Sequence, residues 1–82
     1  MMVMRMRHNL NIKLNENYNM KVYYSSDDIC YYCDILNSDG NVVFEFADPD
    51  AVYRSEKNLP AYFKDKGNYI VKNMKERFTN DK

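Results

Sequence analysis

From Met4 to Leu14, apolar-type and polar residues alternate without a break. The even-numbered positions hold Met, His, Leu and Ile, and the odd-numbered positions hold only Arg, Asn and Lys. A period of two is typical of a strand with one buried face in an antiparallel sheet. Residues 15–17 are expected to turn the chain, and the alternation resumes from Tyr18 to Tyr24, which predicts the return arm of a hairpin.

Two further strands follow the hairpin. From Ile29 to Leu36, apolar residues occur at both even and odd positions, that is, on both faces of the predicted strand. This strand is therefore expected to lie in the interior of the sheet. The stretch 37–40 ends in Asp-Gly, the strongest turn signal in the chain, because glycine supplies the positive φ that a tight turn requires. Alternation from Val42 to Ala47 then predicts a fourth strand. The four strands are expected to follow one another in a meander.

The period changes at Asp48-Pro49. Asp48 can cap free backbone N–H groups, and Pro49 suits the first helical position, where its missing donor is not needed. We therefore expect a helix to begin at Pro49. It should end before the segment 58–60, because the residue that precedes Pro60 is disfavoured in the helical region.

A last helix is predicted over residues 68–78. Gly67 is expected to end a short turn that precedes it, since glycine is a common helix terminator. Ile70, Met74 and Phe78 are spaced four apart, with Val71 beside them, and should form the face that packs on the core. The predicted fold class is α+β, a four-stranded antiparallel meander sheet followed by two helices packed on one face, and residues 1–82 are expected to form one small domain.

The charges are segregated although the formal net charge is zero. Residues 1–24 hold four basic residues and one acidic residue, whereas residues 25–50 hold seven acidic residues and no lysine or arginine. Residues 51–82 hold eight basic and four acidic residues. An acidic middle therefore lies between two basic ends, and such a concentrated field can steer a partner of opposite sign.

Two interpretations of the acidic middle remain open. Aspartate is a turn residue, and four of these acids fall in predicted turns or caps. The complete lack of basic residues is instead typical of a contact surface for a basic protein, such as the nucleic-acid-binding groove of a partner or complex. The candidate partner-binding residues are Asp27, Asp28, Tyr32, Asp34, Asp39 and Glu45.

An alternative site lies on the predicted solvent-facing side of the first two strands. Basic residues interleaved with aromatic rings bind single-stranded nucleic acid by neutralising phosphates and stacking on bases. The competing interpretation is a solvated face whose cross-strand tyrosines shield the backbone. The candidate nucleic-acid-binding residues are Arg5, Arg7, Lys13, Lys21 and Tyr23.

Catalytic, metal and cofactor sites are not expected. Cys30 and Cys33 have C-x-x-C spacing, but residues three apart on a strand point to opposite faces, and a zinc site needs four ligands. Both cysteines are therefore expected to pack as small hydrophobic residues. His8 lies between apolar residues, and a small enzyme or toxin-like nuclease built around it with Arg5 or Arg7 is the third hypothesis.

The N-terminal methionines are interrupted by arginines before the apolar core of a signal peptide could form, and no apolar run approaches the roughly 20 residues of a membrane helix. A cytoplasmic protein with reduced thiols is expected. Four strands leave two sheet edges, so pairing of edges into a homodimer is open.

In length, in its richness in Asn, Lys, Asp and Tyr, and in the acidic stretch from Ile29 to Asp50, the chain resembles small phage or mobile-element inhibitors of the anti-CRISPR type. The resemblance is one of composition and layout, and no functional residue is carried over from it. It implies a stoichiometric blocker of a nucleic-acid site on a host complex. We therefore expect a non-enzymatic, protein-binding inhibitor or regulator.

Overall fold

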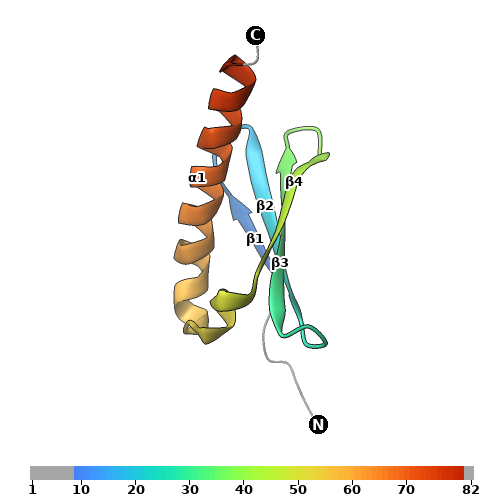
Figure 1. The fold of residues 1–82 in the computed structure, drawn as a ribbon, viewed down its shortest axis with the longest axis vertical. Helices are drawn as coiled ribbons and strands as arrows, with labels where there is room; N and C mark the ends of the chain where they lie inside the picture. Colours follow the sequence, from blue (N-terminus) through green and yellow to red (C-terminus); the bar gives the residue numbers. More distant parts are fainter. Residues whose placement is uncertain (1–8, 81–82) are drawn as a thin grey trace.

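Four strands form one antiparallel sheet in the order β1-β2-β3-β4 (Figure 1). The computed structural model describes residues 9–80, with side chains up to residue 74. The strands are β1 (Leu10–Lys13), β2 (Tyr18–Ser25), β3 (Cys30–Asn37) and β4 (Val42–Asp48). The predicted meander is confirmed, with β3 in the interior of the sheet. The part of the first predicted strand before residue 9 lies outside the described residues.

Local hydrogen bonds shape the hairpin turns where the sequence placed them. The Asn15 Oδ1 atom accepts the backbone N–H groups of Asn17 at 2.7 Å and Tyr18 at 3.0 Å. In the β3–β4 turn, Gly40 has a φ of 87° and donates its N–H to the Asn37 carbonyl oxygen at 2.9 Å. Asparagine and glycine thus supply the turn chemistry that their types favour.

The helical region differs from the expectation. After β4, the chain forms two short 3-10 segments, η1 (Pro49–Tyr53) and η2 (Glu56–Asn58), and then one long helix, α1 (Leu59–Asn80). Asp48 caps η1 as predicted, accepting the Ala51 N–H at 3.1 Å. The prediction of two α-helices is wrong, because the first is a pair of 3-10 turns.

Proline and glycine do not bound the helix as expected. Leu59 adopts helical angles (φ −64°, ψ −40°) although Pro60 follows it. Pro60 lies in the first turn of α1, where backbone N–H groups have no partner within the helix. Gly67 lies in the middle of α1 and does not end it. An ideal Cβ on Gly67 would lie 2.7 Å from the Leu14 Cδ2 atom, so this glycine allows the helix to approach the sheet closely.

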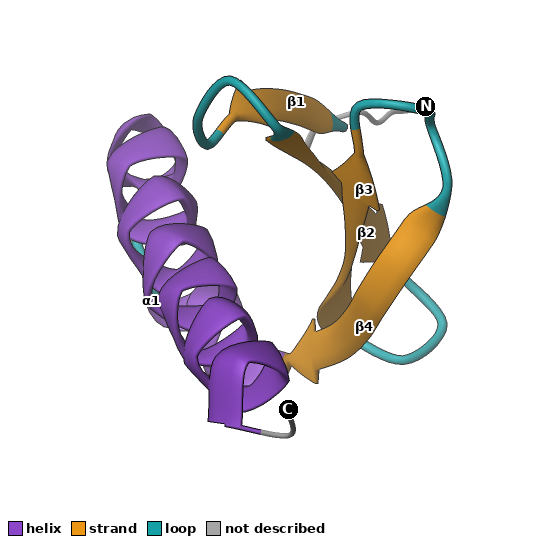
Figure 2. Cartoon of the chain, turned by 90° about the horizontal axis from the view of Figure 1, so that it is seen from above, coloured by secondary structure: helices purple, strands orange, loops and turns teal. Residues whose placement is uncertain are grey.

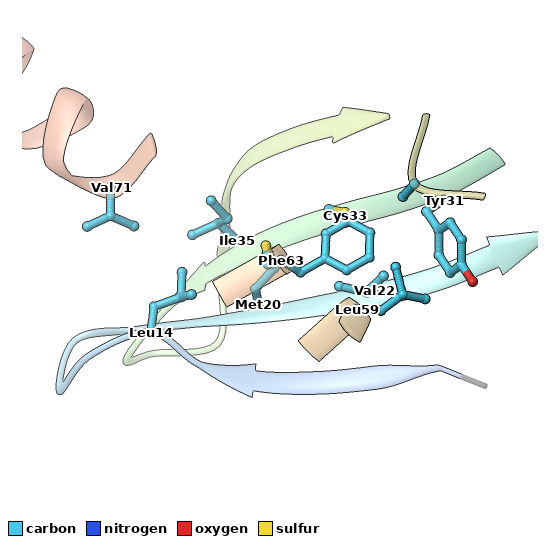
Figure 3. Close-up of a cluster of buried hydrophobic side chains, with 10 residues drawn as sticks. Leu14, Met20, Val22, Tyr31, Cys33, Ile35, Leu59, Phe63 and Val71 are labelled. Atoms are coloured by element: carbon cyan, nitrogen blue, oxygen red, sulfur yellow. The ribbon is translucent and has the colours of Figure 1, made fainter. Parts of the chain in front are cut away.

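The buried face of α1 runs through every fourth residue from Leu59 to Val71. Phe63 is fully buried, with its ring centroid 5.5 Å from that of Tyr31. Val71, predicted beside the packing face, is buried. Ile70 and Met74 are only partly buried, and the Phe78 side chain lies outside the described residues, so the centre of the buried face is shifted toward Val71. The core side chains lie between sheet and helix (Figure 3): Leu14, Met20, Val22, Tyr31, Cys33, Ile35, Ala51, Leu59, Phe63 and Val71.

The helix α1 covers one side of the curved sheet (Figure 2). Strand β4 is an edge strand with most of its residues exposed. Phe44, for example, is 39% exposed although its register partner Ile35 is fully buried. Among the described helices, none is both long enough and apolar enough to cross a membrane.

A partly buried ion pair joins the end of β4 to α1. Asp48, only 2% exposed, accepts hydrogen bonds from the Tyr62 hydroxyl at 2.5 Å and from the Lys66 Nζ atom at 2.6 Å. Burial alone would raise the pKa of Asp48, but the hydrogen bonds from Lys66 and Tyr62 outweigh it and lower that pKa. Burial would lower the pKa of Lys66, and the bond to Asp48 raises it instead.

We expect Gly67→Leu to lower the free energy of unfolding by roughly 1–3 kcal/mol, because the added side chain overpacks against Leu14. In a Leu14→Ala background the penalty should shrink, since the space is then free. Lys64→Leu, on the exposed side of α1, is the control and should change stability by about 0.5 kcal/mol or less. Urea unfolding of the four variants measures this, and equal penalties in both backgrounds would contradict the close approach.

The Asp48–Lys66 pair should make stability depend on acid pH. The folded pKa of Asp48 lies below the ordinary value of 3.8, so its contribution is present above that pH and is lost as the pH falls through the folded pKa. Asp48→Asn should cost roughly 1–3 kcal/mol at neutral pH, less than for a fully buried pair, because the Lys66 side chain is 38% exposed. Its thermal melts should also vary less with pH between about 2 and 5 than those of wild type. Asp50→Asn is the matched control, and identical pH profiles for Asp48→Asn and wild type would refute the coupling.

Candidate functional site

The sheet face opposite α1 carries the side chains that alternate with the buried ones, and we call it the open face. Strands β2 and β3 show this alternation most clearly, since Met20, Val22, Cys33 and Ile35 on the other parity are almost fully buried. The open face consists of Asn11, Lys13, Asn19, Lys21, Tyr23, Tyr32, Asp34, Leu36, Glu45 and Ala47.

Two tyrosines lie at the centre of the open face, each hydrogen-bonded to a carboxylate. Tyr23 and Tyr32 are register partners, and each is 36% exposed. The Tyr23 hydroxyl donates to the Asp34 Oδ2 atom, and the Tyr32 hydroxyl donates to the Asp28 Oδ2 atom at 2.6 Å. The rings are thereby held in place, with a carboxylate at each polar tip.

These hydrogen bonds raise the pKa of both phenols. The bond to Asp34 raises the pKa of Tyr23 to about 12, and burial and the charge of Asp34 add to the effect. The bond to Asp28 likewise raises the pKa of Tyr32.

The charges of the open face are sorted by strand. Lys13 and Lys21 lie on β1 and β2, whereas Asp34 and Glu45 lie on β3 and β4. Lys21 is the register partner of Asp34, which in turn is the register partner of Glu45. One row across the sheet therefore runs from basic to acidic, and the face is polarised from one edge to the other.

Two shallow depressions reflect this polarity. A larger one of about 520 Å³ lies on the basic side and is lined by lysines, amides and the β3–β4 turn: Asn11, Ile12, Lys13, Asn19, Lys21, Leu36, Asn37, Ser38 and Gly40. A smaller one of about 270 Å³ lies on the acidic side and is lined by Tyr32, Cys33, Asp34, Glu45, Phe46 and Ala47.

The turn between β2 and β3 presents an unusual residue. Ile29 has a φ of 52°, in the left-handed region that a β-branched residue rarely adopts, and it is 60% exposed. It follows Asp27 and Asp28 at the end of the sheet. An exposed apolar side chain thus stands beside the carboxylate that holds Tyr32.

The structure brings together part of each predicted set. Asp28, Tyr32, Asp34 and Glu45 lie on or beside one half of the open face, and Asp27 shares the β2–β3 turn with Asp28. Asp39 lies apart from them, in the β3–β4 turn at the opposite end of β3.

The alternative set shares the same surface, because Lys13, Lys21 and Tyr23 also lie on the open face. Arg5, Arg7 and His8 lie outside the described residues. The sequence did not reveal that the tyrosine hydroxyls donate hydrogen bonds to aspartates. Tyr23 and Asp34 are diagonal neighbours on two adjacent strands, and that placement depends on the register between the strands.

Both cysteines are buried free thiols. Cys33 belongs to the core, and Cys30 lies on the other parity of β3, where its Sγ donates to the Tyr31 carbonyl oxygen at 3.4 Å. Burial raises the pKa of Cys33 to about 12, so its thiol stays protonated and unreactive. Within residues 9–74, no group of three or more His, Cys, Asp or Glu side chains is placed to hold a metal ion.

Asp34→Asn should return the pKa of Tyr23 from about 12 toward 10, since the amide accepts a weaker hydrogen bond from the phenol and has no charge to repel the phenolate. NMR of chains labelled at the tyrosine Cζ carbon follows each ring separately through an alkaline titration. Glu45→Gln, which neutralises a nearby acid that accepts no bond from Tyr23, should give a smaller shift. An unchanged titration of Tyr23 in Asp34→Asn would contradict the hydrogen bond between Tyr23 and Asp34.

No family model, curated protein or solved structure matches this chain.

Proposed function

We propose that the chain is a non-enzymatic, protein-binding inhibitor or regulator, and that the acidic half of its open face contacts the basic surface of a nucleic-acid-binding partner. One observation carries the proposal. The Tyr23–Asp34 and Tyr32–Asp28 hydrogen bonds place two carboxylates at the tips of two half-exposed rings, and Glu45 lies in the same register row as Asp34.

This combination suits recognition of arginine and lysine. A ring face attracts a cation through its quadrupole, and a carboxylate beside it can accept a charge-assisted hydrogen bond from the same group. The hydrogen bonds to Asp28 and Asp34 also restrain the rings before binding. Less conformational entropy is then lost when a partner docks, which favours affinity.

Ile29 supports a contact at the β2–β3 turn. Its left-handed backbone angle costs conformational energy, and its exposure leaves its apolar surface in water. Neither feature helps the isolated chain, whereas a partner that covers the turn would bury that side chain beside Asp28. Aliphatic residues flanked by acids suit a partner surface in which apolar and basic residues alternate.

The inhibitory role follows from the chemistry of such a partner. A groove that holds nucleic acid is lined by bases that neutralise phosphates, so an acidic and aromatic surface competes for the same groups. The resemblance to anti-CRISPR-type inhibitors points to the same role. Binding and blockade would then be a single event that requires no catalysis.

Binding of single-stranded nucleic acid by this chain is the second candidate. It is supported by Lys13 and Lys21, which line the larger depression and share the open face with Tyr23. The placement of Asp28 and Asp34 at the ring tips opposes it, because their charges repel phosphates where the bases would stack.

The partner can be captured through the open face itself. A photo-crosslinking benzoylphenylalanine at position 47, exposed beside Tyr32, should capture a protein from a lysate of the source organism, and the same group at position 64 on the outer side of α1 should not. The captured protein is then purified and titrated against wild type and single variants, with association rates measured at low and moderate salt.

We expect Asp28→Lys and Asp34→Lys to weaken binding of that protein by about tenfold or more, mainly through slower association. Asp65→Lys on the exposed side of α1 is the matched control and should bind like wild type. In parallel, fluorescence anisotropy with oligo-dT should show no binding that Lys13→Ala or Lys21→Ala removes. Binding of oligo-dT that those two changes abolish and Asp34→Lys strengthens would replace this proposal with the nucleic-acid one.

A further inference from the structure

The open face is complementary to itself. Its bases, Lys13 and Lys21, lie on β1 and β2, and its acids, Asp34 and Glu45, lie on β3 and β4. The two tyrosines lie between these halves on the two central strands, as register partners. A surface that is basic on one side, acidic on the other and aromatic in the middle matches a second copy that has been turned around.

The two surfaces are matched by a twofold rotation. Its axis runs parallel to the strands and lies above the gap between β2 and β3. The rotation places β2 of one copy over β3 of the other, and β1 over β4. Because Lys21 and Asp34 are register partners, they lie at the same height along the strands. Lys21 of each copy then faces Asp34 of the other, and Tyr23 faces Tyr32.

We propose that two copies of this chain associate through their open faces into a twofold, salt-sensitive homodimer, a sandwich of two sheets with the α1 helices outside. Antiparallel sheets commonly pack face to face with their strands within about 30° of each other. The twofold operator makes the contact isologous, so that it closes at two copies and does not propagate.

The size of the face sets the strength of the contact. Strands β2 to β4 are about 25 Å long and β1 is about 13 Å long, so at a spacing of about 4.8 Å they offer roughly 400 Å² on each copy. Two copies would bury roughly 800 Å², below the 1,200–2,000 Å² of stable complexes and in the range of transient ones. The dimer should therefore form only at high protein concentration and low salt.

The same surface serves the partner of the proposed function, although this inference does not rest on that partner. A second copy would cover Tyr32, Asp34 and Glu45, so dimer and partner complex exclude each other. Self-association is measured with the purified chain alone, and its failure leaves the proposed function standing, just as failure to capture a partner leaves the dimer standing.

Sedimentation equilibrium of the full chain, from about 10 μM to 1 mM, should show a monomer–dimer equilibrium at low salt that shifts to monomer at roughly 0.5 M salt, where the Debye length is only a few ångströms. Concentration-dependent NMR shifts should fall on Tyr23 and Tyr32. Shifts confined to the exposed residues of edge strand β4, with association unaffected by salt, would indicate edge pairing and overturn the proposal, as would a monomer at every concentration.

A charge exchange gives the sharpest test. Lys21→Glu and Asp34→Lys should each weaken self-association by about tenfold or more, because each places like charges opposite one another in the homodimer. An equimolar mixture of the two variants restores both attractive contacts and should form a heterodimer at wild-type strength.

The matched controls are Lys64→Glu and Asp65→Lys, which make the same charge changes on exposed positions of α1 and should dimerise like wild type. Circular dichroism melts establish that each variant is folded. Should one of them fail to fold, the salt dependence and NMR shifts of wild type still decide the question. Folded variants that dimerise normally alone, or a mixture that stays monomeric, would overturn the proposal.

Discussion

The close packing of α1 on one face of the sheet is the contact on which the rest of this structure depends. Its buried row runs at intervals of four from Leu59 through Phe63 and Gly67 to Val71. The glycine in this row lets the helix backbone approach the side chain of Leu14. A core this small has little redundancy, so the quality of this one contact governs the stability of the whole chain.

The helix α1 covers one face of the sheet, and the proposed contacts lie on the open face opposite it. The Asp48–Lys66 ion pair fastens the end of β4 to α1, so the sheet and helix keep a fixed relation. Behind the open face, the fully buried Val22 and Ile35 hold β2 and β3 in register. The positions of exposed groups on this face are thus determined by packing on the opposite side.

The tyrosine–aspartate pairs determine which charge lies beside the aromatic rings of the open face. Without them, Tyr23 would be an aromatic ring beside lysines, as the nucleic-acid hypothesis requires. With Asp34 and Asp28 at the ring tips, the same rings present negative charge. The sorting of charge between strands underlies both proposals, the contact with a basic protein and the contact with a second copy, because both draw on electrostatic complementarity.

The sequence by itself determined the four strands, their turns, the parity of their side chains and the Asp48 cap, because these features depend on neighbours within a few residues. Only the tertiary structure decided that the chain stays helical across Pro60 and Gly67, where packing against the sheet outweighs local preference. It also decided that Asp34 accepts a hydrogen bond from Tyr23, which lies on the neighbouring strand. Such relations depend on register and on which elements pack together, and no short stretch of sequence encodes either.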